Sequence, residues 1–256
     1  MKKKSRFSIG YIISALVMLV LGGVVGAYIG TLGELNIAVI VLFVVFLYLS
    51  MVLHIIIHEF GHMVFGLLTG YRFLSFRVFN LTLIREDGKL RFKKYTLAGT
   101  SGQCLMSPPD FADGKIPVML YNFGGAFMNL IVSALCFPLF WTFQSSTAPG
   151  MFFLVVCLLG VAYAILNGLP MRMGAVNNDG KNAVSLGGNA GALRAWWIQL
   201  KLVELTVGGA RLRDMPEEWF ALPPEEEMGN PLIAYLAVCA CSRLMDRHDF
   251  AQAREL

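Results

Sequence analysis

The stretch from Ile37 to Leu68 reads IAVIVLFVVFLYLSMVLHIIIHEFGHMVFGLL. It is apolar for long enough to cross the hydrocarbon core of a bilayer, which takes about 20 residues of helix. Its second half, however, contains three histidines and a glutamate. Ionisable side chains are expensive inside a membrane and are functional candidates there by default. This one stretch therefore predicts a membrane-spanning helix and also the place where the chemistry of the protein lies.

The polar residues at its end form the pattern HExxH. Residues four apart share one face of a helix, so His58 and His62 can bind one Zn²⁺, and Glu59 can act as general base on the zinc-bound water. The alternative is a polar cluster that joins helices, or the wet end of a span. His54 lies on the same face, but it stands about 12 Å along the helix from His62. Three histidines so spaced cannot share one ion, and we interpret His54 as a packing or gating residue.

Three more apolar stretches are long enough to span a membrane, at Ile9–Gly30, Val118–Phe143 and Met151–Leu169. Of the 256 residues, 56% are hydrophobic and 15% are charged, whereas soluble domains carry about 25% charged residues. The net charge of +4 is too small to indicate a nucleic-acid-binding protein. The first stretch is longer than the apolar part of a signal peptide, which favours an uncleaved helix. We therefore expect an all-α polytopic membrane protein with about four transmembrane helices.

Basic residues predict the orientation of these helices. The N-terminal segment Lys2–Arg6 and the long connection Tyr71–Pro117 are both rich in lysine and arginine. The positive-inside rule places both in the cytoplasm, and alternation places the loops Thr31–Asn36 and Gln144–Gly150 outside. We expect cytoplasmic N- and C-termini and a location in a bacterial plasma membrane. The active site should lie near the cytoplasmic face, because His58 stands about 32 Å along its helix from the outer surface.

The long connection also predicts a β-hairpin at about residues 74–97. Two β-prone runs, Phe76–Arg85 and Lys89–Tyr95, flank the turn signal Asp87-Gly88. The segment Gly99–Gln103, which Pro108 and Pro109 soon follow, is interpreted as a loop that could dip into the membrane. The cytoplasmic connection thus adds a small β-hairpin to the helical fold.

The sequence divides into a membrane core at 1–180 and a cytoplasmic helical tail at 181–256. In the tail, Leu193–Val207 is amphipathic, Asn230-Pro231 is a good start for a helix at Leu232–Met245, and a short helix should begin near Asp249. The last two helices loosely resemble one tetratricopeptide hairpin, which cannot bury its apolar face alone. We therefore expect the tail to dock on the rest of the chain, on a protein partner, or on residues outside this sequence.

A catalytic zinc site usually has three protein ligands, so one must come from another part of the chain. The candidates are the aspartates of three Asp-Gly pairs, at Asp87, Asp113 and Asp179, each of which could equally be an ordinary turn. The first belongs to the hairpin and the second to a polar loop. The third follows the fourth span, which runs in the same direction as the second span. Asp179 should therefore reach the same membrane surface as His58 and His62, and it is the predicted third ligand.

Three motifs in separate spans resemble those of the site-2 protease family of intramembrane zinc metalloproteases. They are the HExxH pattern, Asn167-x-x-Pro170 leading to Asp179-Gly180, and the glycine-to-asparagine motif from Gly125 to Asn129. The resemblance covers about Val39 to Gly180. The chain departs from the family pattern in having Ala126 in place of a proline and a longer segment between Pro170 and Asp179, and it shows no PDZ-like domain.

The resemblance implies roles for the site residues and a reaction. His58, His62 and Asp179 would bind Zn²⁺, and Glu59 would be the base. Asn129 and Asn167 would lie near the site and place the substrate or stabilise the intermediate, although both could simply join helices by hydrogen bonds.

The implied reaction is hydrolysis of a peptide bond in or near a transmembrane segment of a single-span membrane protein or peptide precursor within the lipid bilayer. The substrate helix must open locally, and a strand of the Phe76–Tyr95 hairpin could pair with it.

Two other interpretations remain open. The chain could be a non-catalytic membrane scaffold or adaptor that retains the motif. It could also be a different membrane zinc protease, of the prenyl-protein type, whose third ligand is a glutamate on a later helix. The acidic residues available for that role are Glu204, Glu217 and Glu218, in a region that we predict to be soluble.

Overall fold

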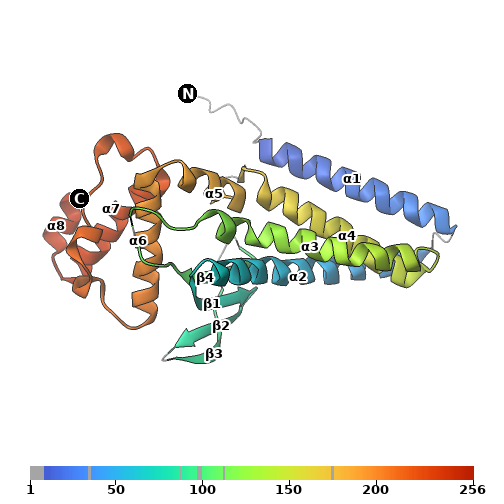
Figure 1. The fold of residues 1–256 in the computed structure, drawn as a ribbon, viewed down its shortest axis with the longest axis horizontal. Coiled ribbons are helices and arrows are strands. Elements are labelled where there is room, and N and C mark those ends of the chain that lie inside the picture. The colour runs from blue at the N-terminus through green and yellow to red at the C-terminus, as the bar shows by residue number, and fades with distance from the viewer. Residues whose placement is uncertain (1–8, 34–35, 87, 97–99, 112, 174–175) are drawn as a thin grey trace.

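The computed structural model describes residues 9–33, 36–86, 88–96, 100–111, 113–173 and 176–256. Four long helices lie side by side in it: α1 (Ile9–Leu32), α2 (Ile37–Leu68), α3 (Met119–Phe143) and α4 (Thr147–Gly168) (Figure 1). All four are long and apolar enough to cross a membrane. The four predicted helices are therefore confirmed as candidate membrane spans, with boundaries that differ by a few residues.

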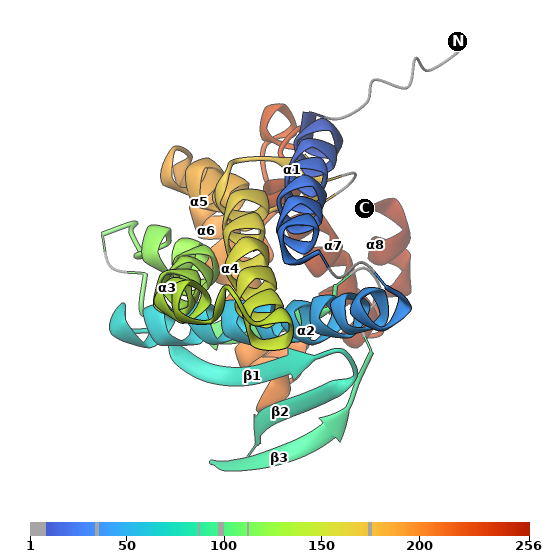
Figure 2. The ribbon, with the colours of Figure 1, turned by 90° about the vertical axis from the view of Figure 1, so that its right-hand side faces the viewer.

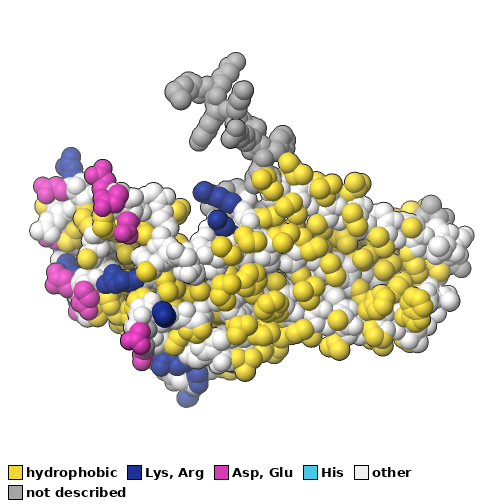
Figure 3. Space-filling view, turned by 45° about the horizontal axis from the view of Figure 1, so that its top comes forward, with side chains coloured by type: hydrophobic (Ala, Val, Ile, Leu, Met, Phe, Trp, Pro, Cys, Tyr) yellow, Lys and Arg dark blue, Asp and Glu magenta, His cyan; other side chains and the backbone are white. Residues whose placement is uncertain are grey.

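The apolar side chains of the four helices are divided between an internal core and an outer surface. In its most hydrophobic window, α4 has 56% of its residues buried, whereas α1 has 6%. Figure 2 shows α4 at the centre, flanked by the other three helices. Apolar side chains cover the bundle in Figure 3, and the charged side chains gather at the end that carries the sheet and the tail. A surface of this kind is suited to lipid along the bundle and to water at one end.

A four-stranded antiparallel sheet lies between α2 and α3 in the chain. Its strands are β1 (Arg72–Val78), β2 (Leu81–Glu86), β3 (Lys89–Lys94) and β4 (Gly102–Ser107). Their spatial order is β3-β2-β1-β4, so β3 and β4 form the two edges.

The sheet corrects two expectations about the predicted hairpin. The run Phe76–Arg85 is not one strand, because the chain turns at Phe79, whose φ is 52°, and Val78 pairs with Leu81. The second correction concerns the predicted loop Gly99–Gln103. Its last two residues begin β4, in which Gln103 pairs with Arg77 of β1. Asp87 of the predicted turn and residues 97–99 lie outside the described residues. The insertion is therefore larger than a hairpin.

The segment after α4 folds back on itself before it reaches Asp179. Its two short strands, β5 (Arg172–Met173) and β6 (Val176–Asn177), pair antiparallel. The helix α5 (Asp179–Gly187) follows at once, with Asn178 as its N-cap. The extra length of this segment is thus taken up by a small hairpin, and Asp179 starts a helix instead of lying on a loose loop.

The tail is helical, as predicted, and it packs on the rest of the chain. Its helices are α6 (Ala190–Val207), α7 (Pro231–Asp246) and α8 (Phe250–Glu255), with three short 3-10 turns before α7, at Leu212–Asp214, Glu217–Trp219 and Glu225–Glu227. The Asn230 side chain accepts a hydrogen bond from the backbone N–H of Leu232, which confirms the predicted cap.

The core of the tail includes Ile116 and Val118, which lie in the connection before α3. Trp197 Nε1 donates a hydrogen bond to the carbonyl oxygen of Pro109 at 2.9 Å, and Arg72 of β1 forms a 2.9 Å ion pair with Glu204 of α6. Docking on the rest of the chain is therefore the arrangement seen here. The division at residue 180 and the cytoplasmic placement of the sheet and tail stay predictions.

Candidate metal centre

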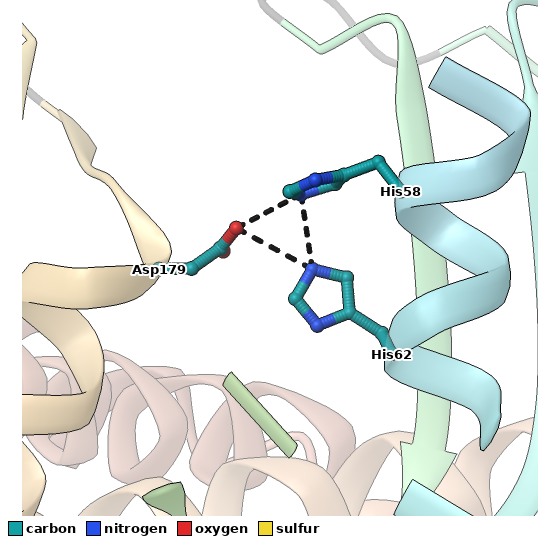
Figure 4. Close-up of side chains that lie close together, drawn as sticks. All are labelled: His58, His62 and Asp179. Atoms are coloured by element: carbon teal, nitrogen blue, oxygen red, sulfur yellow. Dashed lines mark hydrogen bonds and ion pairs between the residues drawn. The ribbon is translucent and has the colours of Figure 1, made fainter. Parts of the chain in front are cut away.

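Three potential ligands converge where the C-terminal part of α2 meets the start of α5. His58 and His62 project from one face of α2, and Asp179 points toward them from the first turn of α5 (Figure 4). The Nε2 atoms of the two histidines lie 3.1 Å apart. The Oδ2 atom of Asp179 lies 2.9 Å from the Nε2 of His58 and 3.4 Å from that of His62. The parallel course of α2 and α4 thus brings together residues that are distant in the chain.

The spacing of these atoms fits a zinc ion. Zinc binds imidazole nitrogen and carboxylate oxygen at about 2.0–2.2 Å, which places tetrahedral ligands about 3.3–3.6 Å apart. The three separations of 2.9, 3.1 and 3.4 Å are close to that edge length. Three protein ligands would leave the fourth tetrahedral position open, as in catalytic zinc sites.

Hydrogen bonds prepare His62 for the role of ligand. Its Nδ1 lies 2.7 Å from the carbonyl oxygen of Tyr121, on α3. A carbonyl oxygen only accepts, so Nδ1 carries the hydrogen. In the neutral ring, Nε2 then has a free lone pair directed at the centre of the site. The backbone of α3 therefore selects the tautomer that can bind a metal.

Asp179 is held in place by the residue before it. The side-chain oxygen of Asn178 accepts hydrogen bonds from the backbone N–H groups of Lys181 (3.0 Å) and Met171 (2.9 Å). Its amide nitrogen donates to the carbonyl oxygen of Leu166 at 2.7 Å. Burial raises the pKa of Asp179, but hydrogen bonds with His58 and His62 outweigh that effect and hold the pKa below its usual range. The carboxylate form, which is the ligand form, is thus favoured near neutral pH.

Glu59 lies beside the three potential ligands and lines the same cavity, whose volume is about 470 Å³. Cys104, in β4, lines the same cavity. A Cβ atom on Gly102 would lie 2.5 Å from Glu59 Oε1, so a larger residue there would displace the carboxylate. Strand β4 therefore packs against the carboxylate and forms one wall of the cavity. Asn167 of α4 and Trp196 of α6 also line the cavity.

The two asparagines of the sequence motifs lie on opposite sides of His58. Asn167 faces the cavity, and its amide nitrogen donates to the carbonyl oxygen of Tyr163 at 3.0 Å. Asn129 is fully buried behind His58 and contacts both His58 and His54. His54 is also fully buried and lies one helical turn before His58 on α2. Asn167 is thus placed to contact a substrate in the cavity, whereas Asn129 contacts His58 on the side away from the cavity.

Sequence reasoning missed several residues that build the site. The cap formed by Asn178 could have been recognised, because asparagine before Asp-Gly is a good helix start as well as a turn. The contribution of Tyr121 comes from a backbone atom, and the identity of a side chain gives no signal for it.

Gly125 allows α3 to approach His58, and its replacement provides a test of the site. A Cβ atom at this position would lie 2.5 Å from Cε1 of His58. We expect Gly125→Ala to displace the imidazole and to weaken zinc affinity about 10-fold or more, the size of effect seen when the surroundings of a ligand are disturbed. Affinity can be measured by competition with a chelator. The control is Gly22→Ala on α1, where a Cβ would meet nothing within 4 Å; equal affinities for the two variants would contradict this account.

A family model described as Peptidase M50B-like matches residues 31–176, more than half of the chain, including both histidines of the site. No curated protein and no solved structure matches the chain. The match ends three residues before Asp179, so the case for this ligand depends on the geometry described above.

Proposed function

Because the chain belongs to the Peptidase M50B-like family, the site-2 protease family of membrane metallopeptidases, we propose that it is an intramembrane zinc endopeptidase. It would hydrolyse a peptide bond in or near a transmembrane segment of a membrane protein or peptide precursor. The observation that carries this proposal is the convergence of His58, His62 and Asp179 beside Glu59, at the end of an apolar helix. A membrane helix has little reason to hold this set unless it binds a metal.

Zn²⁺ bound by the two histidines and Asp179 would supply Lewis acidity and make water a stronger acid. The residues of the chain do the rest. The carboxylate of Glu59 takes the proton of the attacking water and returns it to the leaving amine nitrogen. Strand β4 packs against that carboxylate at Gly102, in the wall of the cavity. Asn167 lines the cavity and could bind the backbone of the substrate.

The substrate must expose backbone that its own helix normally hides, and opened backbone in a membrane needs new hydrogen-bond partners. The sequence suggested a strand between Phe76 and Tyr95 for this pairing. However, β1 and β2 are inner strands, and β3 lies at the edge away from β4. Among the strands of the sheet, β4 is the one that lines the cavity, through Gly102 to Leu105. We therefore propose that the substrate is bound along β4.

A photo-crosslinking experiment tests this assignment. The probe is a tagged single-span reporter whose transmembrane helix contains a glycine-proline break, because such a helix opens easily. A crosslinking amino acid at Gln103 of β4 should capture the reporter in the Glu59→Gln background. The same amino acid at Phe92 of β3, which is 72% exposed, should not. Capture at Phe92 alone would show that β3 is the binding edge.

Removal of the metal tests the reaction itself. The purified chain in detergent should cleave the same reporter, lose cleavage when a zinc chelator is added, and regain it with added Zn²⁺. Cleavage that survives complete removal of zinc would overturn the proposal. A chain that binds zinc tightly but cleaves neither this reporter nor a set of others with helix breaks would instead favour the scaffold interpretation.

The prenyl-protein type of zinc protease is disfavoured by the placement of its candidate ligands. Glu204 forms ion pairs with Arg72 and Lys201, and Glu217 is 82% exposed beside Arg243. Within the part of the chain that the structure describes, the potential metal-binding group consists of His58, His62 and Asp179, with no glutamate. We further propose that the N- and C-termini are cytoplasmic, on the strength of the basic residues in the connection between α2 and α3.

A further inference from the structure

Three buried side chains form a continuous line of hydrogen bonds behind the metal centre. His54 Nε2 lies 2.8 Å from the carbonyl oxygen of Val156, on α4. The Nδ1 of the same ring lies 3.0 Å from the carboxamide of Asn129, on α3. That carboxamide in turn lies 3.1 Å from Nδ1 of His58. The line therefore connects a backbone carbonyl of α4 to the back of a metal-binding imidazole on α2.

The position of His54 is shaped for this arrangement. A Cβ atom on Gly160 of α4 would lie 2.6 Å from Cε1 of His54, so the helix leaves room for the ring at that point. Tyr163, also on α4, stacks on the ring, with centroids 5.9 Å apart. His54 and Asn129 are both fully buried. Their ring and carboxamide are thus held in fixed positions without contact with water.

The two ends of the line determine the direction of its hydrogen bonds. The carbonyl oxygen of Val156 only accepts, so His54 Nε2 carries the hydrogen, and the Nδ1 of the neutral ring is an acceptor. At the other end, His58 can bind a metal through Nε2 only if Nδ1 carries the hydrogen. His54 Nδ1 therefore needs a donor, and His58 Nδ1 needs an acceptor. One carboxamide can serve both, with its NH₂ group toward His54 and its oxygen toward His58.

The carboxamide of Asn129 can take two orientations of nearly the same shape, related by a half-turn. In the structure its nitrogen faces His58 and its oxygen faces His54. This orientation suits a His58 ring whose Nε2 carries the hydrogen and donates it to Asp179. It also places the Asn129 oxygen, which is an acceptor, against Nδ1 of a neutral His54, which is an acceptor too. After a half-turn, the NH₂ group of Asn129 donates to His54 Nδ1 and its oxygen accepts from His58 Nδ1–H. The hydrogen of His58 then lies on Nδ1, so the Nε2 lone pair is free.

We propose that His54 is a positioning residue: acting through Asn129, it orients the carboxamide so that His58 keeps the tautomer whose Nε2 lone pair faces the metal site. This inference rests on the proposed function, because it assumes that His58 is a metal ligand. The distance from His54 to His62 excludes His54 as a ligand of the same ion. In this proposal His54 affects the ion indirectly, through the ligand His58. Asn129 likewise acts on His58 and not on substrate.

Zinc affinity of the purified full chain, measured by competition with a chelator, tests the proposal. His54→Leu removes the acceptor for the Asn129 NH₂ group, and we expect affinity to fall about 10–100-fold, as for lost outer partners of zinc ligands. His54→Gln can accept from Asn129 and donate to Val156 with one amide, so it should restore affinity to within about 3-fold of wild type. The matched control is Ser133→Ala, which loses a buried 3.0 Å bond from α3 to the Cys157 carbonyl oxygen. It should lower thermal stability and leave zinc affinity unchanged.

A second background separates orientation from packing. The two oxygens of a carboxylate are equivalent, so in the Asn129→Asp background His58 Nδ1–H finds an acceptor whichever way the group is turned. The fold-loss in zinc affinity caused by His54→Leu should then be less than about a third of the fold-loss that it causes in the wild-type background. This comparison also serves if the single leucine variant folds poorly.

The outcomes separate this inference from the proposed function. Wild-type affinity in His54→Leu, or an equal loss in the leucine and glutamine variants, overturns the inference alone. It is also overturned if His54→Leu lowers zinc affinity by the same factor in the wild-type and the Asn129→Asp backgrounds. A wild-type chain that binds zinc but does not cleave overturns the proposed function and leaves the positioning role standing. A wild-type chain without zinc affinity overturns both.

Discussion

Replacing Glu59 by glutamine should abolish cleavage while the chain keeps its zinc. Glutamine has nearly the same shape as glutamate, so it should fit against β4 at Gly102 as glutamate does. It cannot, however, take a proton from the attacking water. The loss of a general base typically costs 10²–10⁴-fold in rate, to order of magnitude. The rate of reporter cleavage and the zinc content of the same purified sample are the two quantities to measure.

The matched control for this variant is Glu86→Gln. Glu86 lies in β2 and forms a 2.9 Å ion pair with Lys93 on the surface of the sheet. Its replacement also removes one negative charge, but far from the cavity, so cleavage should stay near the wild-type rate. Cleavage by Glu59→Gln at more than about a tenth of the wild-type rate would mean that another group is the base. Loss of zinc from that variant would mean that Glu59 contributes to the metal site itself.

The main features of the candidate metal centre could be predicted from sequence because they follow from simple periodicities. A spacing of four residues places His58 and His62 on one face of any helix. Alternation of the spans makes α2 and α4 end on the same side, and this topology selected Asp179 from the three Asp-Gly pairs. Both arguments require only that the spans are helical and cross the membrane in turn, which their apolar length already indicates.

The remaining features depend on contacts that a linear pattern does not contain. Strand β4 is short and begins at Gly102, so its sequence resembled a loop. The tight turn at Phe79 joins β1 to β2 and leaves the other edge of β1 to pair with β4. A positive φ at phenylalanine is unusual and leaves no signal in the sequence. His54 gave a different difficulty. Its partners are a backbone carbonyl on α4 and an asparagine on α3, so its position in the line behind His58 was visible only once three helices were packed together.

Removal of Asp179 should have the second large effect, and it tests the ligand that topology selected. In Asp179→Ala only the two imidazoles of α2 remain, and one helix cannot supply a third ligand from the same face. We expect zinc affinity to fall by more than the 10–100-fold typical of lost outer partners, and cleavage at ordinary zinc concentrations to disappear. Asp179→Asn keeps an oxygen but loses the charge, so its affinity should lie between those of the alanine variant and the wild type.

Asp113 provides the matched control because it belongs to another of the three Asp-Gly pairs. It is exposed and has a φ of 52°, and the potential metal-binding group among the described residues does not include it. Asp113→Ala should therefore bind zinc and cleave the reporter as the wild type does. The reverse result, with Asp113 required and Asp179 dispensable for zinc binding, would place the third ligand in the connection before α3. In that case the convergence of α5 on the two histidines would be structural, and Asp179 would serve only to join the start of α5 to α2.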